Sequence, residues 1–145
     1  MCRQILWLYL ALLDIMLNFT SQDTSKQLLS GKGWRVGLRS DVDIYKGLVG
    51  ADSWAIELTE REFKDFCKLA AQLAETMQLM AAELSDCEKI SCTLETEDIS
   101  IEANGYPHAF TLHLQVLMGR RTEGFWEADA VPFLLEAIAH LKFIE

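Results

Sequence analysis

Cysteine is scarce in this chain. The 145 residues contain only four: Cys2, Cys67, Cys87 and Cys92. This density is too low for a disulfide-stabilised scaffold and favours a reducing compartment, the cytoplasm. A zinc site would need two further ligands near Cys87 and Cys92, and the three histidines follow no metal-ligand spacing. We therefore expect no metal and no other cofactor.

Positive charge is scarce as well. The 13 lysines and arginines face 22 aspartates and glutamates, which gives a net charge of −9 and an isoelectric point near 4.8. Proteins that bind nucleic acid usually present a basic surface, so the overall balance argues against that partner. A local group of Lys and Arg still acts within a screening length of about 10 Å, which keeps a small basic surface open as an interpretation.

The arrangements that carry catalysis are also missing. No glycine-rich phosphate loop precedes a helix, and no Ser-His-Asp or Cys-His pattern can be assembled locally. Acidic residues gather between Glu95 and Glu102, but they alternate with strand residues and are expected to face water. Because solvated carboxylates keep similar pKa values, they make a poor acid-base pair. We expect that the protein is not an enzyme.

No hydrophobic run is long enough to span a membrane. Ile5–Leu13 is an unbroken run of nine apolar residues, and Asp14 ends it, whereas a spanning helix needs about 20. The run is interpreted as a short docking helix or as sequence upstream of a natural start, with Met16 as one candidate. Membrane contact is the less favoured alternative.

The segment after this run is polar. Residues 21–30 are rich in Ser, Thr, Gln and Lys, which predicts a linker. We therefore treat residues 1–29 as an N-terminal extension or linker, outside the natural domain on one interpretation, and residues 30–145 as a single α+β domain.

The domain itself opens on residues that alternate with a period of two. From Trp34 to Arg39 the large apolar side chains share one face and the arginines share the other, which predicts a strand. Further strands are predicted over 44–49 and 54–58. Thr59 and Glu62 form a capping box, so a helix is expected to begin there. Its apolar residues are three and four positions apart: Phe63, Phe66, Cys67, Ala70, Leu73, Met77, Met80 and Leu84.

The second half of the chain repeats this order. Alternating residues predict strands over 90–94, 99–103 and 110–116, with Asn104-Gly105 as a hairpin turn. A short strand is expected within 120–126. A second helix is predicted over 130–143, where Pro132 is tolerated because it falls in the first turn. Strands followed by a helix, twice over, predict an α+β fold with antiparallel sheet and two packed helices.

Several motifs stand out in order along the domain. They are Gly33-Trp34-Arg35-Val36-Gly37, Leu48-Val49-Gly50, Trp54-Ala55-Ile56-Glu57-Leu58-Thr59 with Glu62 and Phe66, and Arg121-Thr122-Glu123-Gly124-Phe125-Trp126. Together they resemble a known family, the cyanobacterial domain of unknown function 1818. The resemblance covers roughly residues 30–141. It implies the fold of Whirly-type single-stranded-DNA-binding transcriptional regulators, a duplicated β-β-β-β-α unit. The Lys-Gly-Lys element of Whirly sheets has no counterpart here, because Gly31-Lys32-Gly33 is expected before the first strand.

A small set of residues could form a basic surface. If neighbouring strands bring them together, they would give cations beside aromatic rings, which suits single-stranded nucleic acid. The competing interpretation is that the arginines pair with Asp41, Glu57 or Glu123 and only cover the sheet. The candidates are Arg35, Arg39, Tyr45, Lys46, Arg120, Arg121 and Trp126.

The sequence leaves two interpretations open for Trp126 and two for the function of the protein. Trp54 is expected in the core, whereas Trp126 is either core or a stacking surface. Arg35 and Arg39 are expected to be needed for binding but not for stability. We expect a non-enzymatic module that binds single-stranded nucleic acid as a transcription regulator does. The alternative is a protein-interaction or assembly factor that uses the acidic surface or a sheet edge.

Overall fold

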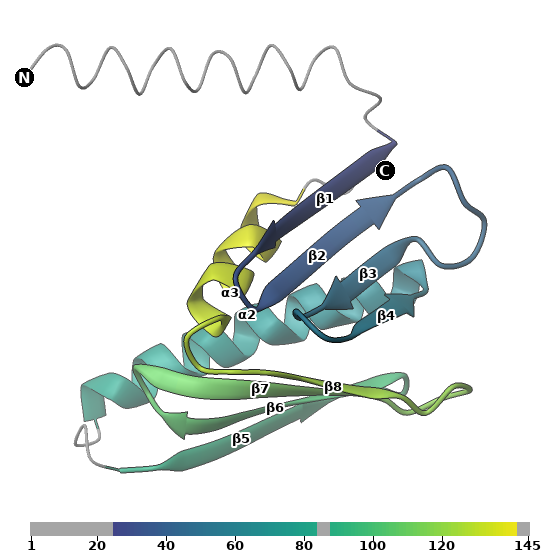
Figure 1. Cartoon of the computed structure of the whole chain (residues 1–145). Coiled ribbons are helices and arrows are strands. Elements are labelled where there is room, and N and C mark those ends of the chain that lie inside the picture. The colour runs from purple at the N-terminus through teal and green to yellow at the C-terminus, as the bar shows by residue number, and fades with distance from the viewer. Residues whose placement is uncertain (1–24, 84–87, 142–145) are drawn as a thin grey trace, which may run out of the picture.

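The computed structural model describes residues 25–83 and 88–141, and these residues form two successive groups of four strands and a helix (Figure 1). The first group is β1 (Lys26–Gly31), β2 (Trp34–Arg39), β3 (Gly47–Gly50), β4 (Ala55–Leu58) and α2 (Glu60–Glu83). The second is β5 (Ile90–Glu95), β6 (Ile99–Tyr106), β7 (Ala109–Val116), β8 (Glu123–Trp126) and α3 (Val131–His140).

Each group forms its own antiparallel sheet of four strands in chain order, β1-β2-β3-β4 and β5-β6-β7-β8. Figure 1 shows the two sheets one above the other, with both helices behind them. Helix α2 contacts strands of both sheets, and α3 contacts β2, β7 and α2. Among the described residues, nothing covers the opposite face of either sheet. The predicted α+β fold, a repeated four-strand-and-helix unit, is confirmed.

The core lies between the sheets and the helices. Met80, predicted near the end of the apolar stripe of α2, is 37% exposed, and Leu84 lies outside the described residues. The rest of that stripe, from Phe63 to Met77, is buried as predicted, and the inward residues of the alternating strands are buried or half-buried. The buried residues include Val36, Val49, Ile56, Leu58, Phe63, Phe66, Leu73, Met77, Ile99, Ile101, Leu112 and Leu114. Because alternate side chains of a strand point to opposite faces, this burial leaves the other half of each strand on the open face.

The predicted capping box at the start of α2 is present. The amide of Glu62 donates to Thr59 Oγ1 at 3.2 Å, and the amide of Thr59 donates to Glu62 Oε1 at 2.9 Å. Two backbone donors at the helix N-terminus are thereby satisfied. Glu62 is buried, with 6% of its surface exposed, so this carboxylate belongs to the interior.

Two tryptophans join the halves. Trp126 Nε1 donates to the carbonyl of Gly50 at 2.8 Å, and Trp54 Nε1 donates to the carbonyl of Phe125 at 3.1 Å. Their ring centroids are 4.8 Å apart. The expectation for Trp54 holds, since it packs on the core. Trp126 is fully buried, which removes it as a stacking surface.

The predicted linker over 21–30 is wrong from Lys26 onward, where the chain forms strand β1. This strand lies at the edge of its sheet and pairs with β2 alone. Most of its side chains are exposed, so its sequence carries no apolar alternation. Gly31-Lys32-Gly33 does not precede the first strand: Gly31 ends β1, and Lys32 and Gly33 connect it to β2. Gly33 has the positive φ (85°) of a turn.

The predicted hairpin turn at Asn104-Gly105 is also wrong. Strand β6 continues to Tyr106, and Pro107 and His108 make the turn to β7. Gly105 is needed for a close backbone approach: a Cβ there would lie 2.7 Å from the carbonyl oxygen of Ala109. Strand β3 begins later than expected, at Gly47, because the amide of Lys46 donates to the carbonyl of Ile44 in a turn.

The predictions for the apolar run 5–13, and for the part of the linker before Ser25, fall on residues outside the described ranges. Within residues 25–83 and 88–141, no helix combines the length and apolar character that crossing a membrane requires.

We expect Trp126→Phe to lower the free energy of unfolding by about 2–4 kcal/mol, because it leaves the buried carbonyl of Gly50 without its donor and opens a gap in the core. Urea denaturation measures this. Phe125→Leu is the matched control one residue earlier, where the side chain is 45% exposed, and we expect a much smaller change. Equal losses in the two variants would contradict the role of the indole hydrogen bond.

Candidate functional site

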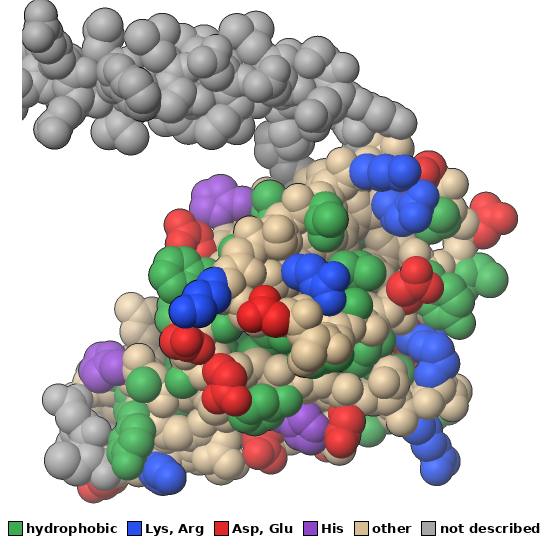
Figure 2. Space-filling view, viewed as in Figure 1, with side chains coloured by type: hydrophobic (Ala, Val, Ile, Leu, Met, Phe, Trp, Pro, Cys, Tyr) green, Lys and Arg blue, Asp and Glu red, His purple; other side chains and the backbone are tan. Residues whose placement is uncertain are grey.

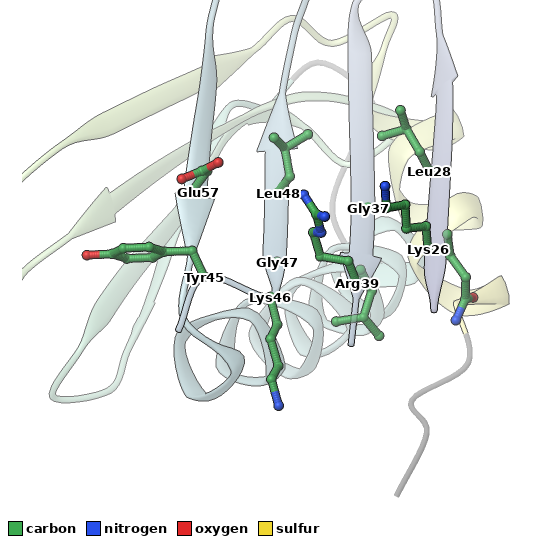
Figure 3. Close-up of a pocket in the computed structure, with 11 residues that line it drawn as sticks. Lys26, Leu28, Gly37, Arg39, Tyr45, Lys46, Gly47, Leu48 and Glu57 are labelled. Atoms are coloured by element: carbon green, nitrogen blue, oxygen red, sulfur yellow. The ribbon is translucent and has the colours of Figure 1, made fainter. Parts of the chain in front are cut away.

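The open face of the first sheet carries a groove of about 210 Å3. It runs across all four strands, and we call it the Gly37 groove (Figure 3). Its lining residues are Lys26, Gln27, Leu28, Gly37, Leu38, Arg39, Tyr45, Lys46, Gly47, Leu48 and Glu57.

The middle of the groove is a line of four neighbouring residues, which we call the central row: Leu28, Gly37, Leu48 and Glu57. Each pairs with the next across the sheet, from β1 to β4. Figure 3 shows them side by side. Gly37 has no side chain and is buried, because Leu28 leans over it: a Cβ on Gly37 would lie 3.0 Å from Leu28 Cδ1. Leu28 itself is 66% exposed. The row therefore offers an apolar floor that ends in a carboxylate.

Three cations lie along one side of the central row, and we call Lys26, Arg39 and Lys46 the cationic row. Lys26 pairs with Arg39 in the sheet register, and the amide of Arg39 donates to the carbonyl of Lys46 at 2.8 Å. In Figure 3, Arg39 reaches toward β3, whereas Lys46 points away from Leu48. Figure 2 shows Lys and Arg side chains at the upper and right edges of this face, and mainly acidic ones over the lower sheet.

Acidic neighbours partly neutralise the cationic row. Arg39 donates to both carboxylate oxygens of Asp41, at 2.7 and 2.8 Å. This hydrogen bonding lowers the pKa of Asp41 to about 2, so the pair is ionised at neutral pH. Lys26 lies 3.9 Å from the same carboxylate, and Lys46 lies 3.4 Å from Glu60. A positive surface remains, but it is weaker than the three cations alone would give.

Tyr45 lines one end of the groove, and Arg120 packs against it. The Arg120 guanidinium lies 4.8 Å from the centre of the Tyr45 ring and donates to Glu62 at 2.8 Å and to the carbonyl of Glu57 at 2.9 Å. Burial opposes the charge of Arg120, but its contacts with Glu62 and Tyr45 outweigh this and raise its pKa. Arg120 therefore anchors the β7–β8 connection to α2. Its guanidinium already contacts the ring of Tyr45.

Arg35 does not behave as the sequence suggested. Its Nε donates to the carbonyl of Ala51 and its Nη2 to that of Trp54, both at 3.0 Å. The side chain is half-buried and holds the β3–β4 turn to β2. These two bonds argue against the expectation that Arg35 is dispensable for stability, because the carbonyls would lose a charged donor.

The remaining candidates lie elsewhere. Arg121 has a positive φ (48°) in the β7–β8 connection and is exposed, but it does not line the groove. Trp126 is in the core. The structure therefore gathers Arg39, Tyr45 and Lys46 from the predicted set, with Arg120 beside them.

The sequence did not single out the other eight lining residues, and four of them show why. Lys26 and Leu28 were assigned to the linker, because an edge strand lacks an alternating pattern. Leu48 and Glu57 were on predicted strands, and their alternation with the buried Val49 and Ile56 was the signal that they share an open face.

Among the described cysteines, Cys67 is buried, and burial raises its thiol pKa to about 12. It is therefore protonated and unreactive at neutral pH. Within the described ranges, no three His, Cys, Asp or Glu residues gather closely enough to hold a metal ion.

Fold and groove together define a class of protein: a duplicated α+β domain whose helices cover one face of two antiparallel sheets and leave a grooved face open. Residues 29–141 match the model of the family DUF1818, a domain of unknown function. The chain belongs to this family.

Solved structures resemble the chain as well, and five chains match. One is described as a protein of unknown function from the DUF155 family of Prochlorococcus sp. NATL2A. It is 26% identical, covers 79% of this chain and 95% of its own length, and superposes with a TM-score of 0.73. No curated protein matches the sequence.

We expect Arg35→Ala to lower the free energy of unfolding by about 2–4 kcal/mol, because two charge-assisted hydrogen bonds to the β3–β4 turn are lost. Chemical denaturation of the full chain measures it. Arg39→Ala, four residues along the same strand, is the control. Its exposed ion pair with Asp41 contributes little, so a loss as large as that of Arg35→Ala would contradict this assignment.

Proposed function

We propose that this protein is a non-enzymatic binding module that holds single-stranded nucleic acid in the Gly37 groove. The observation that carries the proposal is the cationic row beside the central row. Phosphates would lie along Lys26, Arg39 and Lys46, and bases would lie over the apolar floor between Leu28 and Leu48. Single-stranded nucleic acid combines both contacts, because its bases are free to leave the stack.

The shape of the site favours a single strand over a duplex. The floor is shallow and open, and Tyr45, at its end, is 38% exposed and adds an aromatic edge. Bases in a duplex face one another and would present only phosphates to this surface. A Whirly-type fold, which the sequence motifs imply, would favour the same class of ligand and a role in transcription, in the cytoplasm.

The acidic composition sets the expected strength of binding. A net charge of −9 repels nucleic acid at long range, and Asp41 and Glu60 weaken the cationic row nearby. The affinity must therefore come from contacts inside the groove. Three phosphate contacts give a salt dependence, log K against log salt, with a slope of about −2 for a single strand.

We expect the full chain to bind a fluorescent single-stranded oligonucleotide of mixed sequence with that slope, and a duplex of the same sequence much more weakly. Fluorescence anisotropy across a salt series measures both. Lys26→Ala and Lys46→Ala should each weaken binding and reduce the slope by about 0.7, because one phosphate contact is lost. Lys68→Ala is the control, since Lys68 is exposed on α2, which covers the other face of the sheet.

A slope near zero, or equal effects of the Lys26 and Lys68 variants, would contradict the proposal. So would the absence of binding at low salt, where electrostatic attraction is strongest.

A protein partner is the second candidate, and the edge strand β1 favours it. This strand pairs on one side only in the described structure, and it exposes Leu28 (66%) and Leu29 (37%). A strand of a partner could extend the sheet there by backbone hydrogen bonds. In that case Leu28→Lys should abolish partner binding in a pull-down, while Lys46→Ala, at the far side of the groove, should leave it unchanged. The reverse pattern would exclude the β1 edge as the contact.

A further inference from the structure

Glu57 is an acidic side chain inside a groove that is otherwise apolar and cationic. It is exposed at the β4 end of the central row, directly opposite Leu48 in the sheet register. Asp41 and Glu60 each lie against cations. For the Glu57 carboxylate, in contrast, no hydrogen bond or ion pair is found within the described part of the chain. A carboxylate at this place weakens phosphate binding, so its position needs another explanation.

The chemistry of a carboxylate narrows that explanation. An ionised glutamate accepts hydrogen bonds and cannot donate them. Cytosine, adenine and guanine each carry an exocyclic amino group that donates, and carboxylates accept well from the N4 amino group of cytosine. Thymine has a carbonyl oxygen at the equivalent position, which the carboxylate would repel.

The register places this acceptor where the edge of a base would reach it. Neighbouring strands lie about 4.8 Å apart, so Glu57 is about one strand spacing from Leu48 and about 10 Å from Gly37. A base lying over Leu48 would direct its edge toward β4. Figure 3 shows Glu57 beside Leu48, with Arg39 reaching toward Leu48 on β3 from the other side.

Building on the proposed function, we propose that Glu57 makes the groove selective for bases that carry an exocyclic amino group, and hence for cytosine over thymine among the pyrimidines. The carboxylate accepts a hydrogen bond from the amino group, Leu48 supports the ring, and the cationic row holds the phosphates. Glu57 weakens the binding of phosphate close to it, but it lets the groove discriminate between bases.

An electrostatic role is the competing explanation. The charge of Glu57 also acts on Arg39, whose pKa is raised, mainly by the hydrogen bond to Asp41 and further by the charges of Asp41 and Glu57. If Glu57 only balanced this charge, its removal would strengthen the binding of every oligonucleotide by the same factor. Selectivity therefore has to be measured as a ratio of affinities.

The test compares oligo(dC) with oligo(dT) of equal length on the full chain at low salt and pH 7.5, by anisotropy. We expect oligo(dC) to bind about tenfold more tightly. Glu57→Gln should tighten the binding of oligo(dT), because a repulsive charge is gone, and bring the ratio toward one. Glu60→Gln is the control: it removes an acidic charge close to Lys46, and should change both affinities alike.

The outcomes separate this inference from the function on which it rests. Equal binding of the two oligonucleotides by the unmodified chain, or tighter binding of oligo(dT), overturns the role of Glu57 and leaves the binding function standing. A ratio that survives in both Glu57→Gln and Glu57→Ala also overturns it. If neither oligonucleotide binds, the proposed function itself fails.

Discussion

Two indole hydrogen bonds join the first half of the chain to the second along a contact that we call the seam. They are the constraint on which the rest of the structure depends. Trp54 belongs to the first half and donates to β8, while Trp126 belongs to β8 and donates to the end of β3. The seam has no spare volume, since a Cβ on Gly124 would lie 2.2 Å from the Trp54 ring. Each sheet has its own hydrogen-bonded ladder, so these contacts, together with the packing of α2 and α3, set how one sheet lies against the other.

The way in which the two sheets are held together also determines which residues meet at the Tyr45 end of the Gly37 groove. With the sheets held in this way, Arg120 from the second half reaches Glu62 and Tyr45 in the first. Glu62 thus serves twice, since it caps α2 and also accepts a hydrogen bond from Arg120. Because both helices pack on the same side of the sheets, the Gly37 groove is left on the open face. The chain is acidic overall, yet the three residues of the cationic row lie together there.

Much of the fold was predictable because it rests on local patterns. Alternation fixes which side chains of a strand share a face, and a capping box places a helix start, whatever the rest of the chain does. The misjudged elements were those without a local signal. Strand β1 has no well-buried face, so its sequence resembles a polar linker. Gly105 resembles a turn glycine, although it is required by the close approach of the facing strand.

The candidate site likewise combines features that local sequence patterns determine with features that depend on tertiary contacts. By itself, the sequence determined the repeated strand-and-helix order, the core faces, and the open-face positions of Arg39 and Glu57, because these follow from spacing along the chain. Only the tertiary structure decided that Arg35 holds distant carbonyls, that Trp126 is buried, and that Lys26 joins Arg39. Each of these depends on contacts between residues far apart in the sequence, such as Trp126 with Gly50, which no local pattern encodes. The groove exists only because four strands bring Leu28, Gly37, Leu48 and Glu57 into one row.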